Sequence, residues 1–307
     1  MGEEQPEPAS ALDGRTHAYR ADLADIRLRG KVASAAFVDG KPRQVRAAAL
    51  PLRERPDMRA GLANEALFGE TMRSFEERAG WAWVQLDHDG YVGYVPAQAL
   101  SGEVAAATHR VAALGTFVYP EPNIKTTPLL HLTMNAMVAI DETDGKFSRL
   151  TTGGYIVDRH LLPVDKFSLD YAILAERFAG TPYLWGGRTR LGLDCSGLVQ
   201  ICLTAAGIAC PRDSDMQLAA VGAALALDDD LTSLERGDLV FWRGHVGIMI
   251  DGVMLVHANA HHMATVVEPL AQAEARIRRS MSDTEGILAI KRLERRGRGS
   301  GAIDIRA

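Results

Sequence analysis

The sequence predicts an α+β protein in which helices pack on an antiparallel sheet, preceded by two small all-β barrels. Residues 29–165 consist of short alternating segments broken by turn residues, which is typical of small β domains. From Ser168 onward, apolar residues first recur at helical spacing and then form consecutive strand-like runs. A group of helices followed by consecutive strands favours an antiparallel sheet covered by those helices.

The β-rich half is expected to divide into two units. Its clearest strands are the runs VASAAFV, WAWVQL, GYVGYV, MVAI and GGYIV. Gly90-Tyr91-Val92 recurs as Gly154-Tyr155-Ile156 at an offset of 64 residues, each time after an aromatic-bearing strand. We therefore expect the following order: a flexible N-terminal segment (1–28), a first barrel (29–104) and a second barrel (105–165).

The third part, residues 166–294, carries the helices. The run SLDYAILAERFAG predicts a helix with Ser168 as its cap and Gly180 as its end. A second helix begins at Cys195, and a third covers residues 216–227. The runs GDLVFW, HVGIMI, VMLVHAN and GILAIKRL then predict strands. Residues 295–307 are basic and glycine-rich, which is typical of a flexible, solvated tail.

Composition and charge exclude several classes of partner. The 307 residues are 47% hydrophobic and 24% charged, which suits a multidomain globular protein. The net charge of −5 gives no nucleic-acid footprint, and no apolar run approaches the roughly 18 residues of a membrane span. The first twenty residues lack the basic start and apolar core of a secretory signal, and three irregularly spaced cysteines form no disulfide framework. We therefore expect a cytoplasmic protein with neither nucleic acid nor membrane as a partner.

Cys195 is the leading candidate for a catalytic nucleophile. Asp194 is a natural N-cap, so the thiol falls in the first turn of a helix. Unpaired amides and the helix dipole at that end favour the thiolate, the nucleophilic form of cysteine. The alternative is a small buried hydrophobe, a description that also fits Cys202.

Two histidines are candidates for the partners of that thiol, because a nucleophile needs a base and usually a group that orients the base. His245 opens one predicted strand and His257 closes the next, with Asp251-Gly252 between them. A two-residue loop would place the imidazoles on opposite faces of the hairpin. A three-residue loop with Gly252 in the left-handed region would pair Met249 with Val253 and set His245 opposite His257. The chemistry favours the second register, with His245 as base and His257 fixing its tautomer.

Other polar residues near these strands have weaker claims. Asn259, two residues along the face of His257, is the alternative orienting group. His261 and His262 are expected to be structural, because a metal site built from them with His257 has no acidic or thiol ligand at a suitable spacing. We expect neither a metal nor an organic cofactor.

Together these residues resemble the NlpC-type cysteine peptidases of bacterial cell-wall metabolism, whose fold is a reduced papain-like core. The resemblance covers about residues 168–294 and rests on five pieces in the family's order: GTPYLWGG, Asp194-Cys195-Ser196-Gly197, GDLVFW, His245-Val246-Gly247-Ile248 and His257-Ala258. It implies Cys195 as nucleophile, His245 as base and His257 as third member of a triad. It also implies that the Tyr183 hydroxyl helps the Cys195 amide to hold the oxyanion; the structural alternative for this tyrosine is a packed aromatic.

The two barrels look like the bacterial Src-homology-3-like modules of one subgroup of that family. In that subgroup the first barrel overhangs the cleft, and the enzymes cut the bond between γ-D-glutamate and a diamino acid when the preceding L-alanine has a free amino group. The resemblance implies that Asp213 binds this ammonium, that Tyr91 closes the pocket and that Ser196 also contacts substrate. A helix cap is the alternative role of Asp213.

The resemblance implies a γ-D-glutamyl-L-diamino acid endopeptidase, similar to dipeptidyl-peptidase VI, that recycles small murein peptides without a cofactor. The chain departs from the subgroup at one segment: many relatives carry a glutamine within the stretch that corresponds to Ala66–Glu70, whereas here Asn64-Glu65 precede that stretch. Which acid faces the cleft, Glu65 or Glu70, is therefore open. The alternative functions are an inactive peptidase relic that binds wall peptides and an acyltransferase that uses the same thioester.

Overall fold

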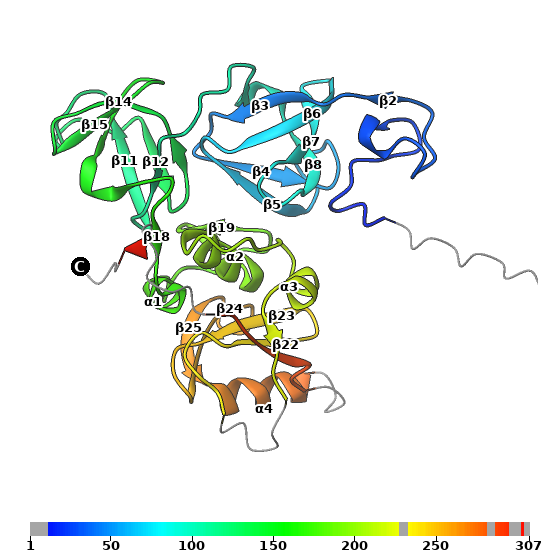
Figure 1. Cartoon of the computed structure of the whole chain (residues 1–307), viewed down its shortest axis with the longest axis vertical. Helices are drawn as coiled ribbons and strands as arrows, with labels where there is room; N and C mark the ends of the chain where they lie inside the picture. Colours follow the sequence, from blue (N-terminus) through cyan, green and yellow to red (C-terminus); the bar gives the residue numbers. More distant parts are fainter. Residues whose placement is uncertain (1–11, 227–232, 281–285, 295–301, 304–307) are drawn as a thin grey trace, which may run out of the picture.

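The computed structural model describes residues 12–226, 233–280, 286–294 and 302–303, and its fold class confirms the prediction (Figure 1). Two β-rich units lie side by side, and a third unit below them carries the helices on an antiparallel sheet. None of the helices in the described ranges combines the length and the apolar character that a membrane crossing requires.

The first β-rich unit is a seven-stranded antiparallel sheet with the order β5-β4-β8-β7-β6-β3-β9. Alternate residues point inward, so Leu52, Met72 and Val84 are completely buried in its core. Its strands are β3 (Lys41–Val45), β4 (Ala49–Arg53), β5 (Leu62–Leu67), β6 (Thr71–Arg78), β7 (Trp81–Leu86), β8 (Val92–Pro96) and β9 (Leu100–Ser101).

Residues 12–28, which we expected to be flexible, lie against this first unit. β1 (Ala24–Asp25) pairs in parallel with β2 (Phe37–Val38), and the 3₁₀ turn η1 (Ile26–Leu28) lies between them. The backbone N–H of Val92 donates to the carbonyl of Arg15 at 2.8 Å. The segment is thereby fixed along the start of β8, a position that matters for the site below.

The second β-rich unit contains a five-stranded sheet, β12-β11-β16-β15-β14, and a three-stranded sheet, β13-β10-β17. Its core contains Val111, Leu132 and Ile156. The strands are β10 (His109–Val111), β11 (Gly115–Tyr119), β12 (Leu130–Thr133), β13 (Met137–Val138), β14 (Ile140–Thr143), β15 (Phe147–Leu150), β16 (Tyr155–Val157) and β17 (Leu161–Pro163).

The repeat seen in the sequence has a structural counterpart. Gly90 and Gly154 both have positive φ, 75° and 88°, where glycine is favoured, and each precedes a strand, β8 or β16. Each strand then runs into a 3₁₀ turn, η2 (Ala97–Ala99) or η3 (Asp158–His160), and a short final strand. The two units therefore repeat the same strand, turn and strand order.

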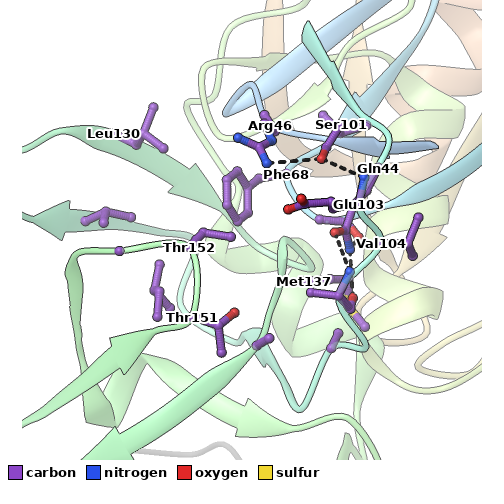
Figure 2. Close-up of a pocket in the computed structure, with 18 of the residues that line it drawn as sticks. Gln44, Arg46, Phe68, Ser101, Glu103, Val104, Leu130, Met137, Thr151 and Thr152 are labelled. Atoms are coloured by element: carbon purple, nitrogen blue, oxygen red, sulfur yellow. Dashed lines mark hydrogen bonds between the residues drawn. The ribbon is translucent and has the colours of Figure 1, made fainter.

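A cavity of about 500 Å³ lies where the two β-rich units meet (Figure 2). The N–H of Met137 donates to the carbonyl of Phe68 across this contact at 2.8 Å. Within the cavity wall, Arg46 donates to the Ser101 hydroxyl at 3.1 Å. None of the predicted catalytic or substrate-binding residues lines this cavity, so it is separate from the candidate active site.

The third unit is built on a six-stranded antiparallel sheet with the order β21-β26-β22-β23-β24-β25. α1 and α2 pack on one face with Phe241 and Ile248, and α4 packs on the other with Trp242 and Met249. The helices are α1 (Tyr171–Arg177), α2 (Cys195–Ala205), α3 (Ser214–Ala220) and α4 (Leu270–Ser280). The strands are β18 (Phe167–Ser168), β19 (Arg188–Thr189), β20 (Gly192–Leu193), β21 (Ala223–Ala224), β22 (Leu239–Trp242), β23 (His245–Met249), β24 (Met254–Asn259), β25 (Ala264–Pro269), β26 (Ala289–Arg292) and β27 (Ala302–Ile303).

Three predicted element ends were wrong. α1 is capped by Asp170, which accepts from the N–H groups of its first turn, while Ser168 belongs to β18. The helix predicted over residues 216–227 is shorter, because Gly222 adopts a φ of 64° and the chain continues into β21. In the predicted flexible tail, β27 pairs in parallel with β18, and the rest of the tail lies outside the described residues.

Candidate active site

Cys195 occupies the start of α2, as predicted. The Asp194 side chain accepts from the backbone N–H of Gly197 at 2.7 Å, which caps the helix. Residue 197 must be glycine, because a Cβ there would lie 2.3 Å from the carbonyl oxygen of Gly187. Close packing of α2 against the preceding loop therefore sets where the thiol lies. The Cys195 side chain is buried, with 7% of the residue exposed.

Asp194 is the centre of a buried polar cluster that fixes this helix start. Arg212 donates to both carboxylate oxygens of Asp194, at 2.9 and 2.7 Å, and to the Ser196 hydroxyl at 2.9 Å. The N–H of Gly186 adds a further bond at 2.8 Å. Ser196, predicted to bind substrate, therefore has its hydroxyl held inside this cluster. Its position supports the geometry of the neighbouring thiol.

The two histidines are in direct contact. His245 Nε2 lies 2.8 Å from His257 Nδ1. Both rings project from the same face of the hairpin formed by β23 and β24, as the chemistry predicted.

The register that brings them together differs from the predicted one. Met249 pairs with Leu255, not with Val253, so the three-residue loop covers residues 251–253. Gly252 is not in the left-handed region. Instead the Asp251 side chain accepts from the N–H groups of Val253 and Met254, both at 2.7 Å, and closes the turn without a positive φ. His245 and His257 consequently meet diagonally across the two strands, since the shift of register preserves the face.

Glu268 completes the chain of contacts behind the histidines and was missed from the sequence. His257 Nε2 lies 2.7 Å from Glu268 Oε1, and Arg276 of α4 binds both oxygens of that carboxylate. In β25, Glu268 pairs with Leu255, which places it on the face of His257. An acid in an apolar strand, eight residues before an arginine on the next helix, was the available signal.

The carboxylate fixes the tautomers of both rings. Because Glu268 can only accept, His257 carries its proton on Nε2 and accepts at Nδ1 from the Nε2–H of His245. His245 is then left with an unprotonated Nδ1 as its basic nitrogen. Asn259, the alternative orienting group, contacts His257 Nε2 at 3.1 Å and accepts from the N–H of His262. The contact that orients His245 is therefore made by His257.

The Cys195 thiol lies near the start of β23, where His245 is the first residue. The sulfur lies 4.0 Å from the carbonyl oxygen of Gly244, and the backbone N–H of Val246 acts to lower the pKa of the thiol. No hydrogen bond joins the thiol to His245 in the described part of the chain. A catalytic bond of this kind often tightens only when substrate is bound.

Burial sets the protonation of the resting site. It raises the pKa of Cys195 to about 12, reinforced by the negative charge of Asp194 and only partly opposed by the N–H groups of Val246 and Ser196. Burial therefore opposes the expected preference of the helix start for a thiolate, and it is the larger of the two effects. Burial lowers the pKa of His245 to about 3 and that of His257 to about 4. Burial acts to raise the pKa of Glu268, but bonds from Arg276 and His257 outweigh it and lower the value to about 2. At neutral pH these pKa shifts favour a neutral Cys195 thiol, neutral imidazoles on both histidines and an ionised Glu268 carboxylate.

Tyr183 lies half-buried beside the segment that leads into α2, where it forms a β-bridge with Leu193. Burial, and then the charges of Cys195 and Asp194, raise the pKa of its hydroxyl, so the hydroxyl stays protonated. Within the described ranges, that hydroxyl has no hydrogen-bond partner. It is an available donor close to the thiol, as an oxyanion site requires.

Asp213 and Tyr91 join the first unit to the third. The Tyr91 hydroxyl donates to Asp213 Oδ2 at 3.1 Å, and Arg15 donates to the same oxygen at 2.9 Å. Asp213 occupies the N-cap position of α3, as the alternative role expects, but its side chain makes no cap bond there. Burial raises the pKa of this carboxyl, against the opposing effects of Arg212, Tyr91 and Arg15.

Both barrel acids left open by the sequence bind Arg188 of the third unit. Glu70 forms an ion pair with its guanidinium at 2.5 Å, and Glu65 accepts from its backbone N–H at 2.9 Å. Burial raises the pKa of Glu65, which also feels the charges of Arg212 and Asp194. These contacts anchor the first unit over the start of α2.

The remaining histidines and cysteines do not extend the site. His261 and His262 stack edge to face with ring centroids 4.7 Å apart. Cys202 and Cys210 are buried free thiols. No cluster of three or more histidine, cysteine or acidic residues in the described ranges is arranged to hold a metal ion.

Comparison with known proteins gives matches for the first and third units. Residues 180–278 match the NlpC/P60 family, and residues 52–100 match the bacterial dipeptidyl-peptidase SH3 domain. The chain is 24% identical over 253 residues to dipeptidyl-peptidase 6 of Lysinibacillus sphaericus, covering 75% of this chain and 92% of the relative. It is 27% identical over 248 residues to a γ-D-glutamyl-L-lysine dipeptidyl-peptidase of Bacillus subtilis, covering 72% and 82%.

A solved structure has a similar fold over most of the chain. The crystal structure of an NlpC/P60 family protein from Bacillus cereus covers 82% of this chain and 99% of its own, with a TM-score of 0.66 at 19% identity. At that identity the likeness supports the fold alone.

Proposed function

Because the chain is an NlpC/P60 cysteine peptidase that carries a bacterial SH3 domain in front of its catalytic domain, we propose that it hydrolyses the bond between γ-D-glutamate and a diamino acid. The proposed substrates are small peptidoglycan-derived peptides that begin with L-alanine bearing a free amino group. Two relatives, of which this chain covers 92% and 82%, are named for dipeptidyl-peptidase activity, one of them on γ-D-glutamyl-L-lysine.

The observation that carries this proposal is the contact between Asp213 and Tyr91. The carboxylate leaves its helix and points to a tyrosine of the first unit, at the boundary between the SH3-like unit and the catalytic unit. Tyr91 is buried and Asp213 is partly buried, with 24% of its side chain exposed, so the pair is matched by a polar, positively charged ligand group. An N-terminal ammonium fits that requirement, whereas an acylated amine carries no charge with which to bind the Asp213 carboxylate.

The proposed reaction proceeds through a thioester. As the Cys195 sulfur attacks the γ-glutamyl carbonyl carbon, its proton moves to His245 Nδ1, because the resting thiol is neutral. The Cys195 amide and the Tyr183 hydroxyl donate to the oxyanion. The C–N bond then breaks as His245 returns the proton to the departing amine of the diamino acid.

Water completes the cycle. His245 accepts a proton from the water that attacks the thioester carbonyl, and the C–S bond breaks to release L-Ala-γ-D-Glu and the thiol. Each step uses only protons carried by the chain and by water, so no metal or organic cofactor is needed. We further propose that the enzyme works in the cytoplasm on imported peptides.

The experiment is product analysis by mass spectrometry with purified protein and L-Ala-γ-D-Glu-diaminopimelate. The expected products are L-Ala-γ-D-Glu and free diaminopimelate, and the Cys195→Ala variant should form neither. An intact tripeptide, despite a Cys195 that still reacts with iodoacetamide, would refute the proposed activity. Added amines that appear in the product would indicate an acyltransferase, and binding without turnover would indicate a peptidase relic.

A further inference from the structure

Arg15 binds the Asp213 carboxylate, which is the group proposed to bind the ammonium of the substrate. Its Nη1 donates to Asp213 Oδ2 at 2.9 Å and to Asp215 Oδ1 at 3.0 Å, while its Nη2 donates to Asp215 Oδ2 at 2.7 Å. The third carboxylate around the guanidinium is Asp13, which Nε and Nη2 contact at 2.7–3.2 Å. A cation of the protein therefore lies where an ammonium is expected to bind.

The backbone of Arg15 is fixed, while its side chain is partly exposed to solvent. Its carbonyl accepts from the N–H of Val92, the residue after Tyr91, so the arginine is held beside the pocket wall. Its side chain is 39% exposed, as are large parts of Asp13 and Asp215, at 40% and 62%. Asp13 and Asp215 can therefore keep the guanidinium paired when it leaves Asp213. Of the three carboxylates, Asp213 is the most enclosed, with a side chain 24% exposed.

We propose that Arg15 is a specificity-determining residue that neutralises Asp213 in the empty enzyme and gives way to the ammonium of the incoming peptide. This inference rests on the proposed function and names a competition at the same site. Two cations at one partly buried carboxylate repel each other, so the guanidinium shifts toward Asp13 and Asp215 when the ammonium arrives.

The competition has a clear consequence for affinity. The substrate binds only to the fraction of enzyme in which Asp213 is open, so its apparent affinity falls by that fraction. If Arg15 covers the carboxylate about nine-tenths of the time, removing it improves apparent affinity about tenfold. A peptide without a free amine gains nothing from displacing the arginine, so Arg15 also sharpens selection for the amine.

The kinetic test compares the intact chain with Arg15→Ala on the tripeptide L-Ala-γ-D-Glu-diaminopimelate. The expected result is a KM about tenfold lower in Arg15→Ala, with kcat within twofold. Arg27→Ala is the matched control, because Arg27 lies on the same N-terminal segment and pairs with Asp25 and Gln85, and no bond joins it to Asp213 in the described part of the chain. A KM that rises in Arg15→Ala would instead make Arg15 a ligand of the substrate and overturn the proposal.

A second measurement does not depend on turnover. The guanidinium resonances of Arg15 are followed by NMR in arginine-labelled Cys195→Ala protein and assigned by their loss on Arg15→Ala. We expect them to shift when Asp213→Asn is added, and to shift when the product L-Ala-γ-D-Glu is titrated in, with the Arg27 signals unchanged.

The outcomes separate the two claims. No shift with Asp213→Asn means that the contact is absent, which refutes the role of Arg15. No shift when the dipeptide binds, as measured by calorimetry, means that the ammonium does not displace Arg15, which also refutes it. If Asp213→Asn shifts the signals but the dipeptide does not bind and the tripeptide is not cut, the contact stands, and the proposed substrate falls together with the competition.

Discussion

Replacing Glu268 by glutamine tests whether the chain of contacts behind the thiol acts in catalysis. Glu268 accepts a hydrogen bond from His257 Nε2 at 2.7 Å and forms an ion pair with Arg276. Only 11% of its side chain is exposed. Glutamine keeps the size of the side chain and one carbonyl acceptor but removes the negative charge. The substitution therefore leaves the shape of the site intact and weakens the stabilisation of the imidazolium that forms on His245.

The expected loss follows from the strength of one charged hydrogen bond. Such bonds contribute about 1.5–3 kcal/mol, which corresponds to about 10- to 150-fold in rate. Because the glutamine side chain retains an acceptor and acts on His245 through His257, we expect the lower part of that range, about 10- to 30-fold in kcat. Glu268→Ala, which loses the acceptor as well, should cost about 10²-fold.

The assay is steady-state hydrolysis of the tripeptide, with kcat and KM determined separately and thermal unfolding measured on each variant. KM should change less than kcat, because Glu268 contacts His257 and not the proposed substrate. Glu235→Gln is the control, since it removes a carboxylate that pairs with Arg292 in the same unit. Wild-type kcat in a folded Glu268→Gln variant would refute the role of this carboxylate.

The protonation and the donors of the site lead to three further predictions. Alkylation of Cys195 by iodoacetamide should be slow at pH 7 and should rise about tenfold per pH unit up to pH 10, because burial raises the thiol pKa to about 12; a plateau below pH 7 would show a resting thiolate instead. Tyr183→Phe should lower kcat by about 10- to 10²-fold with little change in KM, and unchanged kcat would exclude the hydroxyl from the oxyanion site. His245 and His257 have pKa values lowered from 6.5 to about 3 and 4, so the unfolded chain binds more protons below pH 6.5 and stability should fall as the pH drops from 6.5 toward 3. Denaturant midpoints across that range check the last prediction, and a midpoint independent of pH would contradict it.

Predictions from the sequence were most accurate where a structural feature depends only on neighbouring residues in the chain. Asp194 before Cys195 was recognisable as a cap, and the structure places its carboxylate on the N–H of Gly197. The two histidines were correctly assigned to one face of the hairpin, because both the predicted loop and the observed loop contain three residues. A shift of the pairing by two residues leaves each side chain on the same face. Their register was wrong because it depends on the Asp251 side chain, which closes the turn by accepting two N–H groups. Gly252 was therefore predicted to adopt a positive φ, which the turn does not need because Asp251 closes it.

Features that depend on burial or on distant segments could not be predicted. The Cys195 thiol lies in a helix start that favours the thiolate, yet burial outweighs that effect, and burial is a property of the assembled fold. Glu268 reaches His257 only after β24 and β25 pair. Arg15 is 198 residues from Asp213 in the sequence, and the contact forms because the N-terminal segment lies along β8.

The central claim is that Asp213 selects peptides by their free amino group. The most direct measurement is the ratio of kcat/KM for L-Ala-γ-D-Glu-diaminopimelate to that for its N-acetylated form, determined for the wild type and for Asp213→Asn. We expect a ratio of about 10³ or more in the wild type and a ratio within about tenfold of unity in Asp213→Asn, because the substitution removes the negative charge that distinguishes an ammonium from an acylated amine. Equal hydrolysis of the two peptides by the wild type, or an unchanged ratio in Asp213→Asn, would contradict the account.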